Sequence, residues 1–396
     1  MGLYNFDEII NRRGTKSTKW DAGKLLVEAG MAERFDENTI PAFTADMDFA
    51  CPPAIIEALK KVVDRRIFGY TEPETDGAYY QAVIYWHKRR YGWTFDKSAV
   101  VYMNGTLNAM INAIETFTNE GDGIVIQKPV YAPFEMIINN SGRKVVDNHL
   151  INTNGYYTMD YEDLEKKLSS PENTMMLLCS PHNPVGRIWS EVELQKVREL
   201  CGKYNVILVS DEMHADLIRS EETFVPCAMA GGECKLITCT GINKTFNVAG
   251  LQCTNVVIED SEMCERYQMR ALCKVGPVTP NPFTLEALIA AYTQCDEWLD
   301  EVKRYIDENI EWALGFLKTH LPEVKCRKPE GTYLLWMDFS AYGTSEEVFK
   351  RLSSNANIVL DKGIKYGEDG YIRMCVPMPR SVLKEVFERI YQEMGK

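Results

Sequence analysis

Two charged residues of this chain stand just after apolar runs, where a buried strand would present their side chains to a ligand. Asp211 follows the run 206–210, and Lys244 comes shortly after the run 236–239. A carboxylate in that position can face a ligand cation. Each residue alone also has a plain structural interpretation, because Asp is a common helix N-cap and most lysines are solvated.

Two further segments combine a strand end with turn or helix-start residues. Asn183 lies in Ser-Pro-His-Asn-Pro-Val-Gly after the run 175–179, and Asn-Pro with a nearby Gly first of all indicates a turn. Asn104-Gly105-Thr106 follows the run 100–103, where free N–H groups and a helix dipole would suit a phosphate. The combination of the four segments is far more specific than any one of them.

The elements that must position these residues alternate along the chain from about residue 100. Short apolar runs, typical of strands covered on both faces, are separated by amphipathic stretches with apolar residues at helical spacing. Ser190-x-x-Glu193 is a capping-box signature that opens one of the helices. The pattern predicts an α/β fold with a mostly parallel sheet and ligands at the carboxyl ends of its strands. The predicted strands are 100–103, 124–127, 175–179, 206–210, 236–239 and 255–258.

After Pro282 the pattern changes to two long helical stretches, 283–294 and 296–319, followed by short strands. Thr344-x-x-Glu347 opens another helix, and a last helix closes the chain. This predicts a smaller α+β domain, formed by residues 1–49 and 285–396, beside a large domain of residues 50–284. The predicted strands of the smaller domain are 325–327, 332–339, 358–360 and 371–376.

Composition excludes several classes of partner. The formal charge is −13 with no block of Lys or Arg, which argues against nucleic acid or an anionic membrane. No stretch approaches the ~18 apolar residues of a membrane span, and the N-terminus does not resemble a signal peptide. The twelve cysteines form no Cys-x-x-Cys pair and the five histidines show no metal-ligand spacing. We therefore expect free thiols, no metal site and a cytoplasmic protein.

In order and spacing, the four segments resemble the fold-type I enzymes of pyridoxal 5′-phosphate (PLP), the aspartate aminotransferase superfamily. Further segments resemble its MalY/PatB-type cystathionine β-lyase branch. The resemblance runs over nearly the whole chain and implies a mostly parallel, seven-stranded sheet in the large domain. The branch-specific segments are Lys19-Trp-Asp21, Ala45-Asp-Met-Asp-Phe49, Gly69-Tyr70, Gln127-Lys-Pro-Val-Tyr131, Ser180-Pro-His-Asn-Pro184, Ser210-Asp-Glu-Met-His214, Lys244-Thr-Phe-Asn247 and Pro329-Glu-Gly-Thr-Tyr333.

The resemblance assigns a role to each residue around the cofactor ring. Lys244 would bind PLP covalently and later remove the Cα proton of the substrate. Asp211 would pair with the pyridine nitrogen, and Asn183 would hydrogen-bond the phenolic oxygen, with His214 close behind. Tyr131 would stack on the ring.

The resemblance also assigns the two anionic ends of the ligands. The phosphate would lie on the N–H groups of Gly105 and Thr106, with Tyr70 reaching in from a second subunit of a homodimer. Arg373 would grip the substrate carboxylate with two hydrogen bonds. From the sequence alone, Arg373 is equally well a structural ion pair.

The chain departs from the superfamily pattern near the phosphate. Many members carry hydroxyl residues three places and one place before the lysine and an Arg eight places after it, where this chain has Gly241, Asn243 and Gln252. The phosphate would then depend on Thr240, Tyr70 and the amides of the helix start.

The resemblance implies an enzyme that acts on a small amino acid. The first hypothesis is β-elimination of a thiol from an S-substituted cysteine such as cystathionine, which gives pyruvate and ammonia. The second is an aminotransferase, because the catalytic set is shared between both activities. A third, from another class, is a non-catalytic regulatory protein of the same fold, against which the retention of the whole residue set argues.

Overall fold

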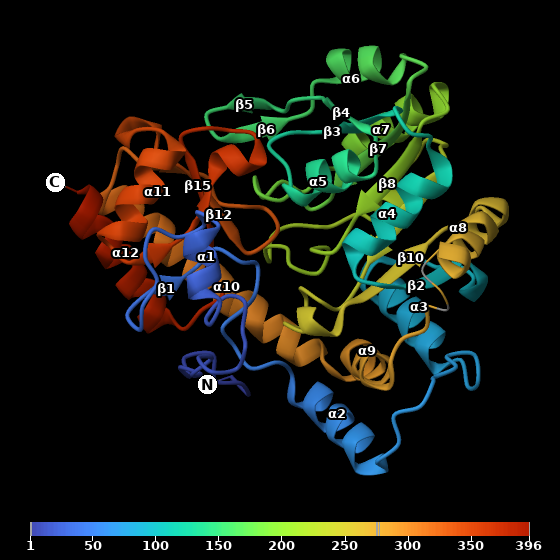
Figure 1. Ribbon diagram of the computed structural model, residues 1–396, viewed down its shortest axis with the longest axis horizontal. Helices are drawn as coiled ribbons and strands as arrows, with labels where there is room; N and C mark the ends of the chain where they lie inside the picture. The colour runs from blue at the N-terminus through green and yellow to red at the C-terminus, as the bar shows by residue number, and fades with distance from the viewer. Residues whose placement is uncertain (1, 275, 277, 396) are drawn as a thin grey trace.

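A seven-stranded sheet lies at the centre of the larger part of the chain (Figure 1). The computed structural model describes residues 2–274, 276 and 278–395. The strand order is β2-β10-β9-β8-β7-β3-β4, and β10 runs antiparallel to both of its neighbours. The predicted mostly parallel, seven-stranded sheet is therefore confirmed. The strands are β2 (Val100–Asn104), β3 (Gly123–Ile126), β4 (Lys144–Asp147), β7 (Asn173–Cys179), β8 (Ile207–Asp211), β9 (Leu236–Thr240) and β10 (Cys253–Val257).

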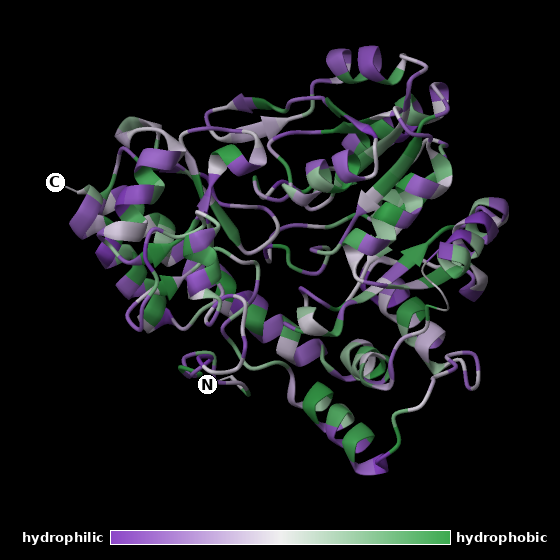
Figure 2. Ribbon diagram, in the orientation of Figure 1, coloured by the Kyte–Doolittle hydropathy of each residue, from purple (hydrophilic) through white to green (hydrophobic). Residues whose placement is uncertain are grey.

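Helices cover both faces of this sheet because its strands bury side chains in both directions. Along β7, Leu177 belongs to one apolar cluster while Met176 and Leu178 belong to the cluster on the other face. Figure 2 shows these strands in green where they lie between the helices. The first cluster includes α4 (Thr106–Phe117), α5 (Pro133–Asn140) and α8 (Ser261–Lys274), and the second includes α6 (Tyr161–Leu168) and α7 (Glu191–Lys203).

Both predicted capping boxes are formed. The Ser190 side chain accepts from the Glu193 N–H at the start of α7, and the Glu193 carboxylate accepts from the Ser190 N–H. Thr344 and Glu347 do the same at the start of α11 (Ser345–Ser354). Each such cap contributes about 1 kcal/mol to its helix and fixes where the preceding loop enters it.

The carboxyl-terminal part builds a four-stranded antiparallel sheet of order β11-β12-β15-β14. The amino-terminal segment joins it, because β1 (Ile40–Pro41) pairs in parallel with β13 (Ile358–Val359). These strands share one apolar core with the surrounding helices. The remaining bounds are β11 (Lys325–Cys326), β12 (Leu334–Asp338), β14 (Asp361–Lys362), β15 (Tyr371–Cys375), α9 (Pro282–Gln294), α10 (Asp296–His320) and α12 (Arg380–Met394).

Three further α-helices, a small hairpin and five short 3-10 helices complete the described chain, the last being η1 (Lys97–Ala99), η2 (Cys227–Met229), η3 (Ala249–Leu251), η4 (Ser340–Tyr342) and η5 (Gly363–Tyr366). Helix α2 (Pro53–Arg65) projects from the body in Figure 1, and α3 (Ala78–Tyr91) leads back to the large sheet. In the part of the chain that the structure describes, no helix is long and apolar enough to cross a membrane. The predicted domain boundaries at residues 49/50 and 284/285 stay a prediction. The other bounds are α1 (Gly23–Glu28), β5 (Ile151–Thr153) and β6 (Tyr156–Thr158).

Candidate active site

A cavity of about 490 Å³ opens where the carboxyl ends of β7 and β8 meet the start of α4 and strand β15. Its volume is in the range of small-molecule sites. The structure brings together all of the predicted site residues except Tyr70 and Thr240. The predicted residues that line it are Gly105, Thr106, Tyr131, Asn183, Asp211, His214, Lys244 and Arg373.

Asp211 ends β8 and turns its carboxylate toward this cavity. It is buried, and its Oδ1 accepts a hydrogen bond from the Met213 N–H at 3.2 Å. Burial raises the pKa of Asp211 to about 6, and the backbone hydrogen bond and the charge of Lys244 oppose that rise. Among the described residues Asp211 has no ion-pair partner. A buried carboxylate without a cation is suited to a protonated ring nitrogen.

The next residue, Glu212, is a second buried carboxyl but points to other partners. Its Oε1 accepts hydrogen bonds from Ser210 Oγ at 2.9 Å and from the Cys227 N–H at 2.8 Å. Burial raises the pKa of Glu212 to about 8. Glu212 is therefore protonated at neutral pH and leaves Asp211 as the anion of this pair.

These two carboxyls predict a pH dependence of stability for the PLP-free protein. The pKa of each is higher in the folded chain, about 6 for Asp211 and about 8 for Glu212, than its ordinary value of 3.8 or 4.5. The folded state therefore binds more protons, and the free energy of unfolding should fall by roughly 2–5 kcal/mol between pH 5 and 8. Urea unfolding at both pH values measures this. Glu212→Gln should reduce the slope, and an unchanged slope in that variant would contradict the assignment.

Lys244 follows β9, which borders β8 on the side away from β7. Its side chain lines the cavity. Its Nζ donates to the Ala45 carbonyl at 2.7 Å. Burial lowers the pKa of the Lys244 amine, while the nearby Cys375 and Asp46 raise it. A lowered pKa increases the fraction of neutral amine, which is the form that acts as nucleophile and base.

Arg373, on β15, is held by three groups. Nη1 donates to Asn183 Oδ1 at 3.1 Å, and Nη2 donates to the Phe43 carbonyl at 2.6 Å and pairs with Asp361. Nε is buried and has no partner among the described residues. Arg373 therefore forms a buried ion pair with Asp361, and its predicted binding of a substrate carboxylate stays a prediction. Because Nη2 already serves two acceptors, Nε is the donor left for a substrate carboxylate.

Sequence reasoning missed Asp361, although it stands after the predicted strand 358–360, as Asp211 stands after its own run. Asp361 is buried and also accepts from Lys365 Nζ at 3.0 Å and from Tyr366 Oη at 3.1 Å. All three side chains line the cavity. Asp361 therefore fixes the position of Arg373. It also holds a second cation, Lys365, beside Arg373 in the cavity lining.

His214 and Tyr131 complete the inner wall. Burial lowers the pKa of His214 to about 3, so the ring is neutral, and its buried Nδ1 has no partner among the described residues. The ring lies edge-to-face on Tyr333 at 5.6 Å. Burial raises the pKa of Tyr131 to about 12, which keeps its hydroxyl protonated. The predicted stacking of Tyr131 on a cofactor ring stays a prediction.

The start of α4 lines another part of the cavity. Gly105 has φ +90°, a backbone conformation that favours glycine, and a Cβ there would meet the flexible end of the exposed Gln252 side chain. The Gly105 N–H donates to the Met103 carbonyl at 3.0 Å. Its predicted contact with a phosphate stays a prediction. The first-turn N–H groups from Thr106 onward are the donors that point out of the helix.

Tyr70 and Thr240 lie outside the lining of the cavity. Tyr70 is fully exposed. Thr240, the last residue of β9, is buried, and its Oγ1 has no partner among the described residues. Their predicted phosphate contacts stay predictions.

The cavity fits three of the polar groups of PLP. Lys244 offers an amine with lowered pKa to an aldehyde, Asp211 a partnerless carboxylate to a pyridinium, and α4 its free N–H groups to a phosphate. Residues 42–390 match the family described as aminotransferase class I and II. The chain belongs to this family.

The similar proteins refine this placement. Cystathionine beta-lyase PatB of Bacillus subtilis is 39% identical over 98% of each chain. Cystalysin of Treponema denticola, solved with PLP, has 33% identity and a TM-score of 0.92 over 99% of each chain. The PLP-bound C–S lyase of Staphylococcus hominis has 31% identity and a TM-score of 0.91 over 99% of this chain and 98% of that one. The predicted PLP-dependent family and its C–S lyase branch are confirmed.

Proposed function

We propose that this chain eliminates a thiol from S-substituted L-cysteine, with PLP bound to Lys244. The observation that carries the proposal is one cavity with an amine of lowered pKa, a partnerless buried carboxylate and an arginine with a free donor, in a chain similar to C–S lyases over its whole length. One substrate and one water give a thiol, pyruvate and ammonia.

Each residue then has one task. PLP supplies the electron sink that makes the Cα proton of the amino acid removable. Lys244 would accept that proton with the amine that it presents to the cavity. Asp211 would keep a proton on the ring nitrogen, and Asn183, whose Oδ1 accepts from Arg373, would hydrogen-bond the ring oxygen. Arg373 would bind the substrate carboxylate, and the C–S bond of the substrate would break to release the thiol.

The experiment that tests the function is a pyruvate assay with L-cystathionine as the only substrate. We expect pyruvate, ammonia and a thiol in equal amounts without any added keto acid. If pyridoxamine phosphate accumulates and turnover requires a keto acid, the aminotransferase hypothesis replaces the lyase, as the family description allows. A protein that binds no added PLP would support the non-catalytic hypothesis instead.

Arg373→Lys should raise KM for the amino acid by roughly 10–100-fold, because a lysine keeps the charge but loses the Nε and Nη1 donors. Asp361 would still have a cationic partner in Lys365, so the fold should survive. Steady-state kinetics measure the effect, and cofactor absorbance checks that PLP binding is unchanged. An unchanged KM would assign Arg373 a purely structural role.

We further propose a homodimer in which Tyr70 reaches the partner's cavity. Tyr70 is fully exposed, and its neighbours Ile67 and Phe68 are 75% and 58% exposed, an apolar surface that a second copy would cover. Sedimentation should give twice 45.2 kDa. Mixing inactive Tyr70 and Lys244 variants should restore activity, because a mixed dimer contains one intact site. No recovery in a proven mixed dimer would contradict the shared site.

The free state of all twelve cysteines supports the proposed cytoplasmic location, where thiols stay reduced. The small amino-acid substrate belongs to the same compartment. Cell fractionation with an antibody against the chain tests this location.

A further inference from the structure

One peptide segment touches both functional cations of the cavity. We call residues 42–49 the strap. Two of its backbone carbonyls accept hydrogen bonds from these cations. The Ala45 carbonyl accepts from Lys244 Nζ at 2.7 Å, and the Phe43 carbonyl accepts from Arg373 Nη2 at 2.6 Å. The positions of both side chains therefore depend on where the strap lies.

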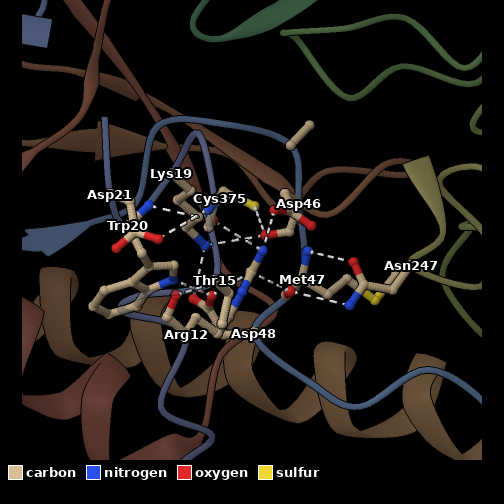
Figure 3. A network of polar contacts seen from close by, with 12 residues as sticks. Arg12, Thr15, Lys19, Trp20, Asp21, Asp46, Met47, Asp48, Asn247 and Cys375 are labelled. Atoms are coloured by element: carbon tan, nitrogen blue, oxygen red, sulfur yellow. Dashed lines mark hydrogen bonds and ion pairs between the residues drawn. The ribbon is translucent and has the colours of Figure 1, made fainter. Parts of the chain in front are cut away.

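A buried ionic cluster holds the strap from its outer side (Figure 3). Asp48 Oδ2 accepts from Lys19 Nζ at 2.7 Å, and Oδ1 accepts from Arg12 Nη1 and Trp20 Nε1, both at 2.8 Å. The Lys19 side chain has no exposed surface, and Asp48 has 7%. Charges desolvated to this degree persist only with close partners, so the geometry of the cluster is tightly determined.

The cluster also forms hydrogen bonds with the backbone of the residues that follow Ala45. Arg12 pairs with the Asp46 carboxylate at 2.5 Å and donates to the Met47 carbonyl at 2.8 Å, while Lys19 donates to the Asp46 carbonyl at 3.0 Å. From the other side of the strap, Asn247 accepts from the Met47 N–H at 3.0 Å and donates to the Met47 carbonyl at 3.1 Å. Figure 3 shows these contacts converging on the strap from both sides.

We propose that Lys19 and Asp48 are positioning residues for Lys244: their ion pair fixes the strap, and the strap fixes the amine. The inference rests on the proposed role of Lys244. Arg373 has Asp361 and Asn183 as further partners, whereas the one hydrogen bond of Lys244 Nζ within the described residues goes to Ala45. Loosening the strap therefore displaces the amine more than the guanidinium.

The test combines amide hydrogen exchange with kinetics in Lys19→Met and Asp48→Asn. Exchange in residues 42–49 should accelerate about tenfold in the PLP-free protein as well as in the PLP-loaded enzyme. kcat should fall about tenfold or more, because small displacements of a catalytic group are costly, and KM should change much less. Trp20→Phe, which removes one donor to Asp48, should give smaller changes in the same direction and guards against loss of folding.

Arg90→Met is the matched control. It breaks a partly buried ion pair between α3 and α10, with Asp296 at 2.6 Å, in which no residue of the strap takes part. It should lower stability without changing exchange in residues 42–49 or kcat. Unchanged exchange in the strap, or a kcat loss in Lys19→Met that matches Arg90→Met at equal stability loss, would overturn the proposal. If the wild type releases no pyruvate, the lyase function fails, while exchange in the PLP-free protein still tests the strap.

Discussion

Replacing Lys244 with alanine is expected to stop turnover and to remove the covalent attachment of PLP. The amine is the group that the cavity offers both to the cofactor aldehyde and to the Cα proton, so its loss should lower kcat by at least about 10³-fold. The purified variant, dialysed without PLP, should lack the visible absorbance band of the wild type. Pyruvate release from L-cystathionine measures the loss of activity.

Lys365→Ala is the control, because Lys365 lines the same cavity but pairs with Asp361 at 3.0 Å. It should retain covalent PLP. After borohydride reduction, mass spectrometry of wild-type peptides should find the cofactor on Lys244. Cofactor attached to another lysine would refute the assignment of this residue.

Asp211→Asn is expected to lower kcat by roughly 10²–10³-fold, the usual effect of removing a preorganised charge from a reaction centre. The amide has nearly the same size and can still accept from the Met213 N–H, but it carries no charge to keep a proton on the ring nitrogen. Affinity for PLP should fall as well, which titration of the PLP-free variant measures.

Glu212→Gln provides the comparison for Asp211→Asn. Glu212 is buried one residue further on, but it faces Ser210 and Cys227, and burial, which raises its pKa to about 8, keeps it neutral. This variant should keep kcat near the wild-type value. Equal losses in both variants would mean that carboxyl burial near β8, rather than the charge of Asp211, matters for the reaction.

The elements of the large sheet were predictable because their strands are covered on both faces and consist of nearly continuous apolar runs. Six of its strands lie where such runs occur. The edge strand β4 was missed, since Lys144 and Asp147 at its ends interrupt the apolar pattern. The antiparallel direction of β10 has no signature in a short strand that is buried throughout.

The parts of the candidate site that side chains form could be predicted from the sequence. The contacts that backbone carbonyls make there could not. Asp211 and Lys244 stand out at strand ends, but the carbonyls of Phe43 and Ala45 have no residue-type signature. The hydrogen bond from the Gly105 N–H to the Met103 carbonyl is another backbone contact that residue types do not indicate. Cation partners such as Asp361 need tertiary contacts, which no local spacing contains.

The pairing of β1 with β13 has a consequence for the order in which the protein is made. Thr39 bonds Asn357, 318 positions later, and Ala42 bonds Cys375 through its carbonyl. The segment that contains β1 leaves the ribosome before its partner strands are synthesised. The large sheet, whose strands lie between residues 100 and 257, can form while translation continues. The nascent chain therefore acquires a complete cofactor pocket only after β13 and β15 have been synthesised.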